Sequence, residues 1–195
     1  MSASEVPSHT LLVGFDEAGR GPLAGPVCAA AVILPDDFPV EILNDSKKLS
    51  EKKRAAAETV IKEKAFWGIA LVDHKKIDEI NILEASMLAM KLAFEDMVKK
   101  NPDLKLSEIS GITDGTRCPD VPIECRCEPK ADGKYPCVMA ASILAKTCRD
   151  RLMLEMDKKY PEYGYAKHKG YPTKAHREIC HKLGPSPIQR LTFKY

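Results

Sequence analysis

Two acidic residues, Asp16 and Glu17, stand side by side at the end of a short apolar run over residues 11–15. They are followed at once by the Gly-Arg-Gly segment of residues 19–21. Carboxylate oxygens suit hard cations such as Mg²⁺ and Mn²⁺, and glycines let the main chain approach a ligand closely. The pattern indicates a divalent cation held close to a phosphate. The alternative is that an Asp-Glu pair before glycines merely ends a surface strand.

Two further carboxylates repeat this arrangement. Asp114 ends the run over residues 109–114, Asp132 follows the run over residues 123–129, and a glycine comes after each. Carboxylates gathered at one edge of a sheet repel one another, and two Mg²⁺ ions about 4 Å apart would compensate them and could drive hydrolysis of a phosphodiester. The sequence shows no credible nucleophilic Ser or Cys dyad, so the four carboxylates favour metal-assisted phosphodiester hydrolysis.

Strands and helices must position these carboxylates. We predict strands over residues 11–16, 27–34, 66–72, 109–114 and 123–129, and helices over residues 51–64, 77–99, 135–159 and 173–183. From residue 163 we expect a basic loop before the last helix and an irregular tail after it. Ser50 is a suitable N-cap for the first helix, and the Met-rich stripe of the second indicates core packing. Strands that come first as a meander and then alternate with helices favour a mixed α/β sheet. No linker or repeat divides the chain, so we expect one domain over residues 1–195.

The charge of the chain is unevenly distributed. Residues 130–195 carry 14 basic and 6 acidic residues, whereas residues 1–129 carry 16 basic and 22 acidic ones. A basic segment beside acidic strand ends suits a metal-dependent enzyme that acts on a polyanion. An ordinary solvated lysine-rich surface would give the same count.

The seven cysteines and the N-terminal sequence bear on the compartment. Residues 1–10 do not resemble a secretory signal, and the apolar run over residues 22–34 is interrupted and too short to span a bilayer. We therefore expect a reduced, cytoplasmic protein with free thiols and no membrane partner. Four cysteines could suggest zinc, but they lack a paired Cys-x-x-Cys, which disfavours that interpretation. These are Cys118, Cys125, Cys127 and Cys137.

The chain also resembles a known family. The segments GFDEAGRGPLAGPV, NDSKKLS, ITDG, MAASILAKTCRDRLM and KHKGYPT, in this order, are similar to those of ribonuclease HII, the type 2 ribonucleases H. The resemblance covers about residues 11–193. No large N-terminal extension of the kind that marks ribonuclease HIII precedes it, and Tyr171 follows Lys169 and Gly170 as in ribonuclease HII, so we expect the latter.

The resemblance implies a fold and an activity. The fold would be a ribonuclease H-like mixed five-stranded sheet flanked by helices, with a short helical C-terminal segment over about residues 163–195 that completes the substrate groove. Asp16, Glu17, Asp114 and Asp132 match the family's catalytic carboxylates, which would bind two Mg²⁺ or Mn²⁺ ions. The family cuts 5′ of ribonucleotides in RNA–DNA hybrids, or of single ribonucleotides embedded in duplex DNA, and leaves 3′-OH and 5′-phosphate ends.

The resemblance further implies how the substrate is read. Gly19, Arg20 and Gly21 match the loop that tests for the ribose 2′-OH through backbone groups, which is the group that distinguishes RNA from DNA. Tyr171 matches the tyrosine that stacks on the following sugar. Together they would read an RNA-to-DNA junction.

Other polar positions are expected to contact the substrate backbone. They are Asn44, Ser46 and Lys47 in one loop, Ser142, Lys146 and Arg149 on one face of the long helix, and His168 and Lys169 before Tyr171. The first group could instead form a capped turn, and the second a solvated stripe.

Two other functional classes stay open. One is a different nuclease or a transposase-type enzyme on the same sheet, against which the Gly-Arg-Gly loop and Tyr171 argue. The other is a nucleic-acid-binding protein without catalysis, which would be expected to have lost a carboxylate. We expect a monomer, and the tail after Leu191 is too short to support binding to a replication clamp.

Overall fold

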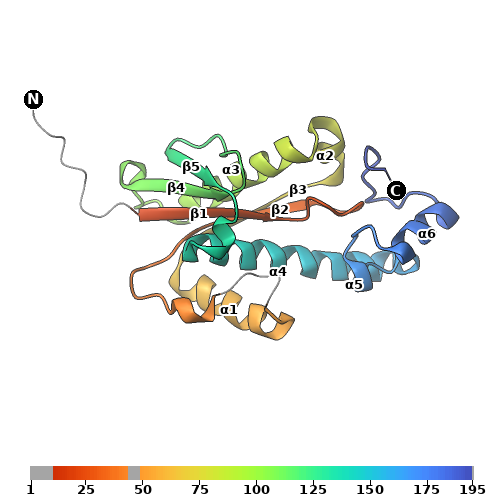
Figure 1. Cartoon of the computed structure of the whole chain (residues 1–195), viewed down its shortest axis with the longest axis horizontal. Coiled ribbons are helices and arrows are strands. Elements are labelled where there is room, and N and C mark those ends of the chain that lie inside the picture. The colour runs from red at the N-terminus through yellow and green to blue at the C-terminus, as the bar shows by residue number, and fades with distance from the viewer. Residues whose placement is uncertain (1–10, 44–48, 195) are drawn as a thin grey trace, which may run out of the picture.

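The computed structural model describes residues 11–43 and 49–194. A five-stranded sheet in the order β3-β2-β1-β4-β5 forms its centre (Figure 1). The strands are β1 (Leu11–Ala18), β2 (Val27–Ile33), β3 (Phe66–Val72), β4 (Ile109–Asp114) and β5 (Glu124–Glu128). The first three form an antiparallel meander, whereas β4 pairs parallel with both β1 and β5. The predicted mixed sheet of five strands is confirmed.

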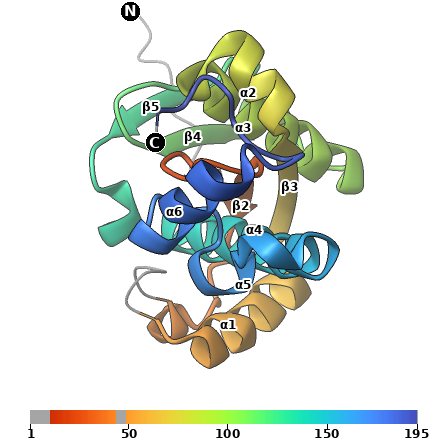
Figure 2. The ribbon, with the colours of Figure 1, turned by 90° about the vertical axis from the view of Figure 1, so that its right-hand side faces the viewer.

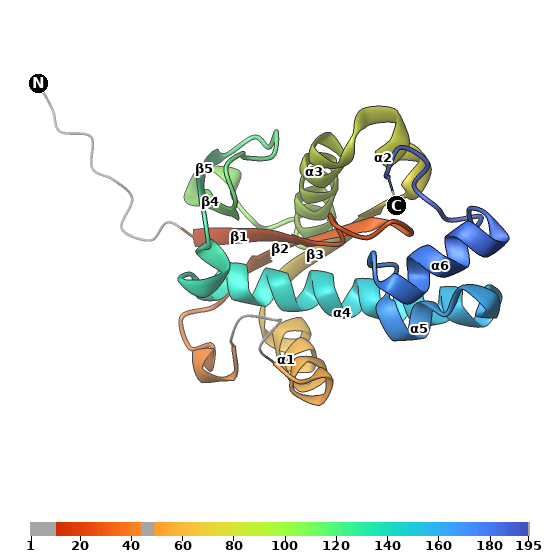
Figure 3. The same cartoon turned by 45° about the vertical axis from the view of Figure 1, so that its right-hand side comes forward.

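Helices cover both faces of the sheet. They are α1 (Glu51–Lys64), α2 (His74–Ile80), α3 (Ile82–Lys100), α4 (Pro136–Lys159), α5 (Tyr165–His168) and α6 (Lys174–Leu183), with 3₁₀ turns η1 (Val40–Ile42), η2 (Leu106–Glu108), η3 (Ala131–Gly133) and η4 (Pro161–Tyr163). α2 and α3 lie on one side of the sheet, and α4 with α1 beyond it on the other (Figures 1 and 3). α5 and α6 lie together at one end of the molecule (Figure 2).

β2 explains why this sheet has a core on each side. Every residue of the strand is buried, and successive side chains of a strand point to opposite faces. The odd-numbered residues 27–33 belong to the apolar cluster under α3, whereas Cys28, Ala30 and Val32 belong to the cluster under α4 and α1. The apolar run that predicts this strand is therefore required by burial on both faces.

A glycine fixes the approach of α4 to β1. A Cβ placed on Gly14 would lie 2.3 Å from the carbonyl carbon of Cys137 and 2.4 Å from the amide nitrogen of Val138. Only a residue without a side chain allows the first turn of α4 to pack directly on β1. This contact sets where the rest of α4, including Ser142 and Lys146, lies along the strand.

Several local predictions are confirmed. Ser50 caps α1 by accepting a hydrogen bond from the Lys53 amide, and the methionines of the α3 stripe, Met90 and Met97, are fully buried in the core. All seven cysteines are free. None of the helices in the described part of the chain is long and apolar enough to cross a membrane.

Three predictions about elements are wrong. The helix expected over residues 77–99 is two helices, because Asn81 adopts a left-handed φ of 68° and its Oδ1 accepts hydrogen bonds from the amides of Leu83 and Glu84. It thereby ends α2 and caps α3. β1 continues to Ala18, beyond the expected end at residue 16, so Glu17 lies within the strand and not after it. The basic segment that follows α4, expected as a loop, contains η4 and α5.

Candidate active site

The pairing of β1 with β4 brings two of the predicted carboxylates together. The strands run parallel with Phe15 opposite Thr113, so Asp16 and Asp114 are the next residues along. Asp16 shares its face of β1 with Gly14, which packs on α4, and Asp114 shares its face of β4 with Ile112, which packs with Val138 of α4. Both side chains therefore lie on the α4 side of the sheet, whereas Glu17 extends from the opposite face of β1.

Asp16 is a buried carboxylate among other acids. Burial raises the pKa of Asp16 well above its ordinary value, and the charges of Glu17 and Asp114 raise it further. The Glu17 amide donates to Asp16 Oδ1 at 2.7 Å, and the Ser142 side chain donates a second hydrogen bond to this carboxylate, both of which favour the charged form. A cation would relieve the repulsion that remains, and an all-oxygen donor set suits Mg²⁺ or Mn²⁺.

Asp132 is linked to this edge through the backbone. The Ala131 amide donates to Asp114 Oδ1 at 2.8 Å, which ties the end of β4 to η3, the turn that carries Asp132. Asp132 thus lies on a turn that follows the end of β5.

The carboxylates do not form a ready-made ligand cage. Within the described residues, no group of three or more His, Cys, Asp or Glu side chains is arranged to hold a metal ion as it stands. Asp16 and Asp114 are bonded to main-chain amides, and Glu17 lies 3.5 Å from an Nη of Arg20.

We call the ends of β1 and β4 that carry Asp16, Glu17 and Asp114 the carboxylate edge. A cleft of about 470 Å³ extends from Asp16 and Glu17 of this edge to the predicted recognition residues. Its lining consists of Asp16, Glu17, Ala18, Gly19, Arg20, Gly21, Ser142, Lys146 and Tyr171. Tyr171 is 38% exposed, and the Lys146 ammonium lies 5.6 Å from the centre of its ring. One opening thus contains acids, a glycine-rich loop, a cation and an exposed aromatic ring.

Comparison with known proteins identifies the family. The family model described as Ribonuclease HII matches residues 13–195. The chain belongs to the ribonuclease HII family. It is therefore a hydrolase, a metal-dependent endonuclease of the ribonuclease H type.

Relatives in this family are similar over almost the whole chain. The ribonuclease HII of Vibrio parahaemolyticus is 49% identical over 187 residues, which cover 95% of this chain and 85% of the relative. The ribonuclease HII of Acetivibrio thermocellus is 52% identical over 186 residues, or 95% of this chain and 70% of the relative.

Solved structures share the fold. Ribonuclease HII of Archaeoglobus fulgidus, solved in complex with PCNA, superposes with a TM-score of 0.74 at 25% identity, covering 95% of this chain and 96% of that one. Bst ribonuclease HIII, solved in complex with Mn²⁺, superposes with a TM-score of 0.74 at 18% identity, covering 99% and 72%. The latter likeness shows the ribonuclease H-like fold alone.

Arg149 is not the phosphate contact expected for this ribonuclease HII. It lies on the same helix as Ser142 and Lys146 but is only 1% exposed. Its Nε, Nη1 and Nη2 donate to the main-chain carbonyls of Pro26, Lys169 and Ala24 at 2.9, 3.0 and 3.1 Å. The prediction fails because the donors expected for phosphate bind the protein's own backbone.

His168 is not a surface cation either. Its Nδ1 accepts from the Gly170 amide, which leaves Nε2–H to donate to the Tyr163 carbonyl at 2.9 Å, and its ring stacks on His176 with centroids 4.2 Å apart. Burial lowers the pKa of His168, and the neighbouring His176 lowers it further. The ring is therefore neutral and supports the turn before Tyr171. Lys169 is half-buried, and its ammonium donates to the Ala166 carbonyl at the end of α5.

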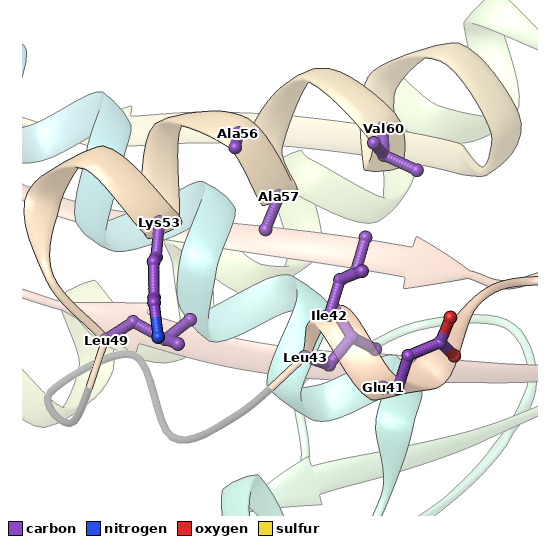
Figure 4. Close-up of a pocket in the computed structure, with 8 residues that line it drawn as sticks. All are labelled: Glu41, Ile42, Leu43, Leu49, Lys53, Ala56, Ala57 and Val60. Atoms are coloured by element: carbon purple, nitrogen blue, oxygen red, sulfur yellow. The ribbon is translucent and has the colours of Figure 1, made fainter.

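The remaining predicted contacts, Asn44, Ser46 and Lys47, lie outside the described residues. Leu43 and Leu49, on either side of them, line a second cavity of about 400 Å³ between η1 and α1 (Figure 4). Among the described residues of its lining, only Glu41 and Lys53 are ionisable, so this cavity shows no pair of carboxylates there.

Sequence reasoning missed one residue of this region altogether. Arg190, in the segment expected to be an irregular tail, is fully buried beside the loop of residues 19–26. Gln189 precedes it and Leu191 and Thr192 follow it, so no local apolar pattern indicates that this arginine is buried.

Proposed function

We propose that this ribonuclease HII hydrolyses the phosphodiester on the 5′ side of ribonucleotides, both in RNA–DNA hybrids and at single ribonucleotides embedded in duplex DNA, leaving 3′-OH and 5′-phosphate ends. The observation that carries the proposal is the composition of the cleft that Asp16 and Glu17 line. It joins buried acids to the backbone of residues 19–21 and to the exposed ring of Tyr171.

Asp16, Glu17, Asp114 and Asp132 would hold two divalent ions, Mg²⁺ or Mn²⁺. When bound, such ions activate a water molecule and stabilise the leaving oxygen of a phosphodiester. The chain's own contribution is orientation. Ser142 and the Glu17 amide fix the Asp16 carboxylate, and the Ala131 amide fixes that of Asp114. The raised pKa of Asp16 supports this assignment, since a cation would relieve the repulsion among these acids.

The recognition side of the cleft would select ribose. The 2′-OH both donates and accepts hydrogen bonds, and the backbone of residues 19–21 offers partners of either kind without intervening side chains at Gly19 and Gly21. Tyr171 would stack on the next sugar, and Lys146, which pairs with Asp150 at 2.8 Å, would contact a phosphate.

A cleavage assay tests the proposal. The protein and Mg²⁺ are incubated with a labelled DNA duplex that contains one ribonucleotide, and with a matched all-DNA duplex. We expect one cut 5′ of the ribonucleotide, none in the control, and none with EDTA. Cleavage of both duplexes would favour a general nuclease, and absence of cleavage in Mg²⁺ and in Mn²⁺ with binding intact would contradict the catalytic proposal.

A further inference from the structure

Arg190 binds the loop that joins β1 to β2 from inside the protein. The side chain is fully buried, and its Nε, Nη1 and Nη2 donate to the carbonyls of Gly25, Arg20 and Gly19 at 2.9, 3.0 and 2.6 Å. A planar guanidinium can bind several acceptors in fixed directions, which an ammonium group cannot do. One side chain from the C-terminal segment therefore holds both ends of the loop.

Arg149 binds the same loop from α4. It donates to the carbonyls of Ala24 and Pro26, and to that of Lys169, two residues before Tyr171. Together the two arginines form a carbonyl clamp, by which we mean Arg149, Arg190 and their six main-chain acceptors. The clamp ties the loop of residues 19–26 and the turn that carries Tyr171 to a single position on α4.

Burying two arginines costs free energy, so stabilising the loop does not by itself explain the clamp. All six acceptors are neutral carbonyls, and two buried cations beside one another repel. Burial, and after it the charge of Arg149, lowers the pKa of Arg190 to about 9. Buried charge of this kind points to a need for fixed backbone geometry.

The geometry that the clamp fixes faces the cleft. No peptide bond of the described residues, including those of the loop, is cis, and in a trans peptide the C=O and the following N–H point in opposite directions. Because Arg190 binds the carbonyls of Gly19 and Arg20 from the buried side, the amides of Arg20 and Gly21 are directed the other way. Residues 19–21 line the cleft, so that direction is toward the substrate side.

We propose that Arg190, assisted by Arg149, is a positioning residue for ribose recognition: it holds the peptide groups of residues 19–21 in the orientation that reads the 2′-OH. This inference rests on the proposed function. Arg190 touches no reacting atom and acts only through the loop.

The segment that carries Arg190 is itself anchored. The Arg190 amide donates to the Leu23 carbonyl, and the Gly25 amide donates to the Ile188 carbonyl. On α2, Asp78 accepts hydrogen bonds from the amides of Leu191 and Thr192 at 2.8 and 3.0 Å. Figure 2 shows this segment running from α6 toward α2. Asp78 thus provides a way to loosen the clamp without removing its guanidinium groups.

Arg190→Lys tests the inference. Two quantities are measured in Mg²⁺: kcat/KM on a duplex with one ribonucleotide, and the inhibition constant of an all-DNA duplex, which reports binding without a 2′-OH. We expect kcat/KM to fall about tenfold or more, as for the loss of one or two hydrogen bonds, while the inhibition constant stays within about twofold. Arg151→Lys, which changes an exposed arginine of α4 that pairs with Glu58, is the matched control and should leave both unchanged.

The outcomes separate the inference from the proposed function. Failure of the parent protein to cut at the ribonucleotide would contradict the proposed function itself. A parent that cuts, with an Arg190→Lys variant that retains kcat/KM or loses DNA binding in the same proportion, would overturn only the positioning role. If Arg190→Lys does not fold by circular dichroism, Asp78→Ala decides: we expect a smaller loss of kcat/KM with unchanged inhibition, and parental kcat/KM would overturn the inference.

Discussion

The carboxylate edge and the carbonyl clamp are two regions of buried charge with opposite sign. At the edge, burial and neighbouring acids raise the pKa of Asp16, and in the clamp, burial and a neighbouring cation lower that of Arg190. Each shift shows that its surroundings favour the neutral form. The regions differ in what compensates the charge, since Arg190 is surrounded by carbonyl dipoles of its own loop, whereas Asp16 lies among other acids.

Because of this difference, the carboxylate edge would be stabilised by a bound cation, whereas the carbonyl clamp needs no ligand. The protein compensates its buried cations internally, so no external partner is implied there. The acids keep a repulsion that two hydrogen bonds to Asp16 do not remove, which leaves room for a cation to stabilise them. We therefore expect changes at the edge to affect activity more than stability, and changes in the clamp to affect stability as well.

Asp114→Asn should break the edge and leave the clamp intact. The substitution removes one of the proposed charged ligands but keeps the oxygen that accepts from the Ala131 amide, so we expect cleavage to fall about a hundredfold or more. Without metal, the melting temperature should stay the same or rise slightly, because Asp114 repels Asp16. Cleavage rate and thermal unfolding are the measurements.

Asp120→Asn is the matched control for this substitution. The Asp120 side chain is 93% exposed and pairs with Lys91, away from the cleft. It should leave both quantities unchanged. Normal turnover by Asp114→Asn would show that the edge does not work through its charge.

Arg149→Lys should break the clamp and leave the edge intact. Lysine keeps the charge but cannot reach three carbonyls with a planar fork, so we expect the free energy of unfolding to fall by roughly 2 to 4 kcal/mol. Denaturation by urea measures this. Arg151→Lys should cost less than about 1 kcal/mol, as for an exposed ion pair. Equal costs for the two variants would remove the distinction between a clamp and a surface contact.

Gly19→Ala and Gly21→Ala compare a glycine that packs against the clamp with one that faces the cleft in the same loop. Gly19 has a φ of 102°, and its Cβ would lie 2.2 Å from Arg149 Nε, whereas the nearest atom to a Cβ on Gly21 is a Tyr171 carbon at 3.9 Å. We expect Gly19→Ala to lower the free energy of unfolding by about 2 kcal/mol or more. Gly21→Ala should change it by less than about 0.5 kcal/mol. If urea denaturation found the reverse order, Gly19 would not be the residue on which the loop closes against Arg149.

The edge could be predicted from the sequence because its determinants are local. Apolar runs predict the strands, and carboxylates at the ends of two parallel strands lie at the same edge of the sheet. The parallel pairing of β1 with β4 then places Asp16 and Asp114 side by side. The position of Asp132 on a turn depends on one hydrogen bond to Asp114 and could only be expected approximately.

The clamp could not be predicted in this way. Arg190 and Gly19 are 171 positions apart, and Arg149 lies in a basic segment where a surface role is the ordinary expectation. Their burial depends on the C-terminal segment folding back over the loop. The break between α2 and α3 could not be predicted either. Ile80 and Ile82 on both sides of Asn81 continue the apolar pattern, so the sequence does not show that Asn81 adopts a left-handed conformation there.

The stacked histidines near the clamp provide the smallest expected effect, a dependence of stability on pH. Burial lowers the pKa of both His168 and His176 in the folded protein, while the unfolded chain keeps the ordinary value of about 6.5. As pH falls below that value, the unfolded chain takes up protons first, so the free energy of unfolding decreases toward pH 5.5 and is constant in this respect above pH 7.5.

Urea denaturation between pH 7.5 and 5.5 measures this dependence. Asp16, whose raised pKa acts in the opposite sense, is common to all variants, so the difference between parent and His176→Phe isolates the histidine. That variant should lose part of the slope, and the exposed His181→Asn should keep it. If the free energy of unfolding depended on pH equally in the parent and in His176→Phe, the stacked histidines would not link the stability of the Tyr171 turn to pH. The position of this turn would then depend on the two arginines of the clamp alone.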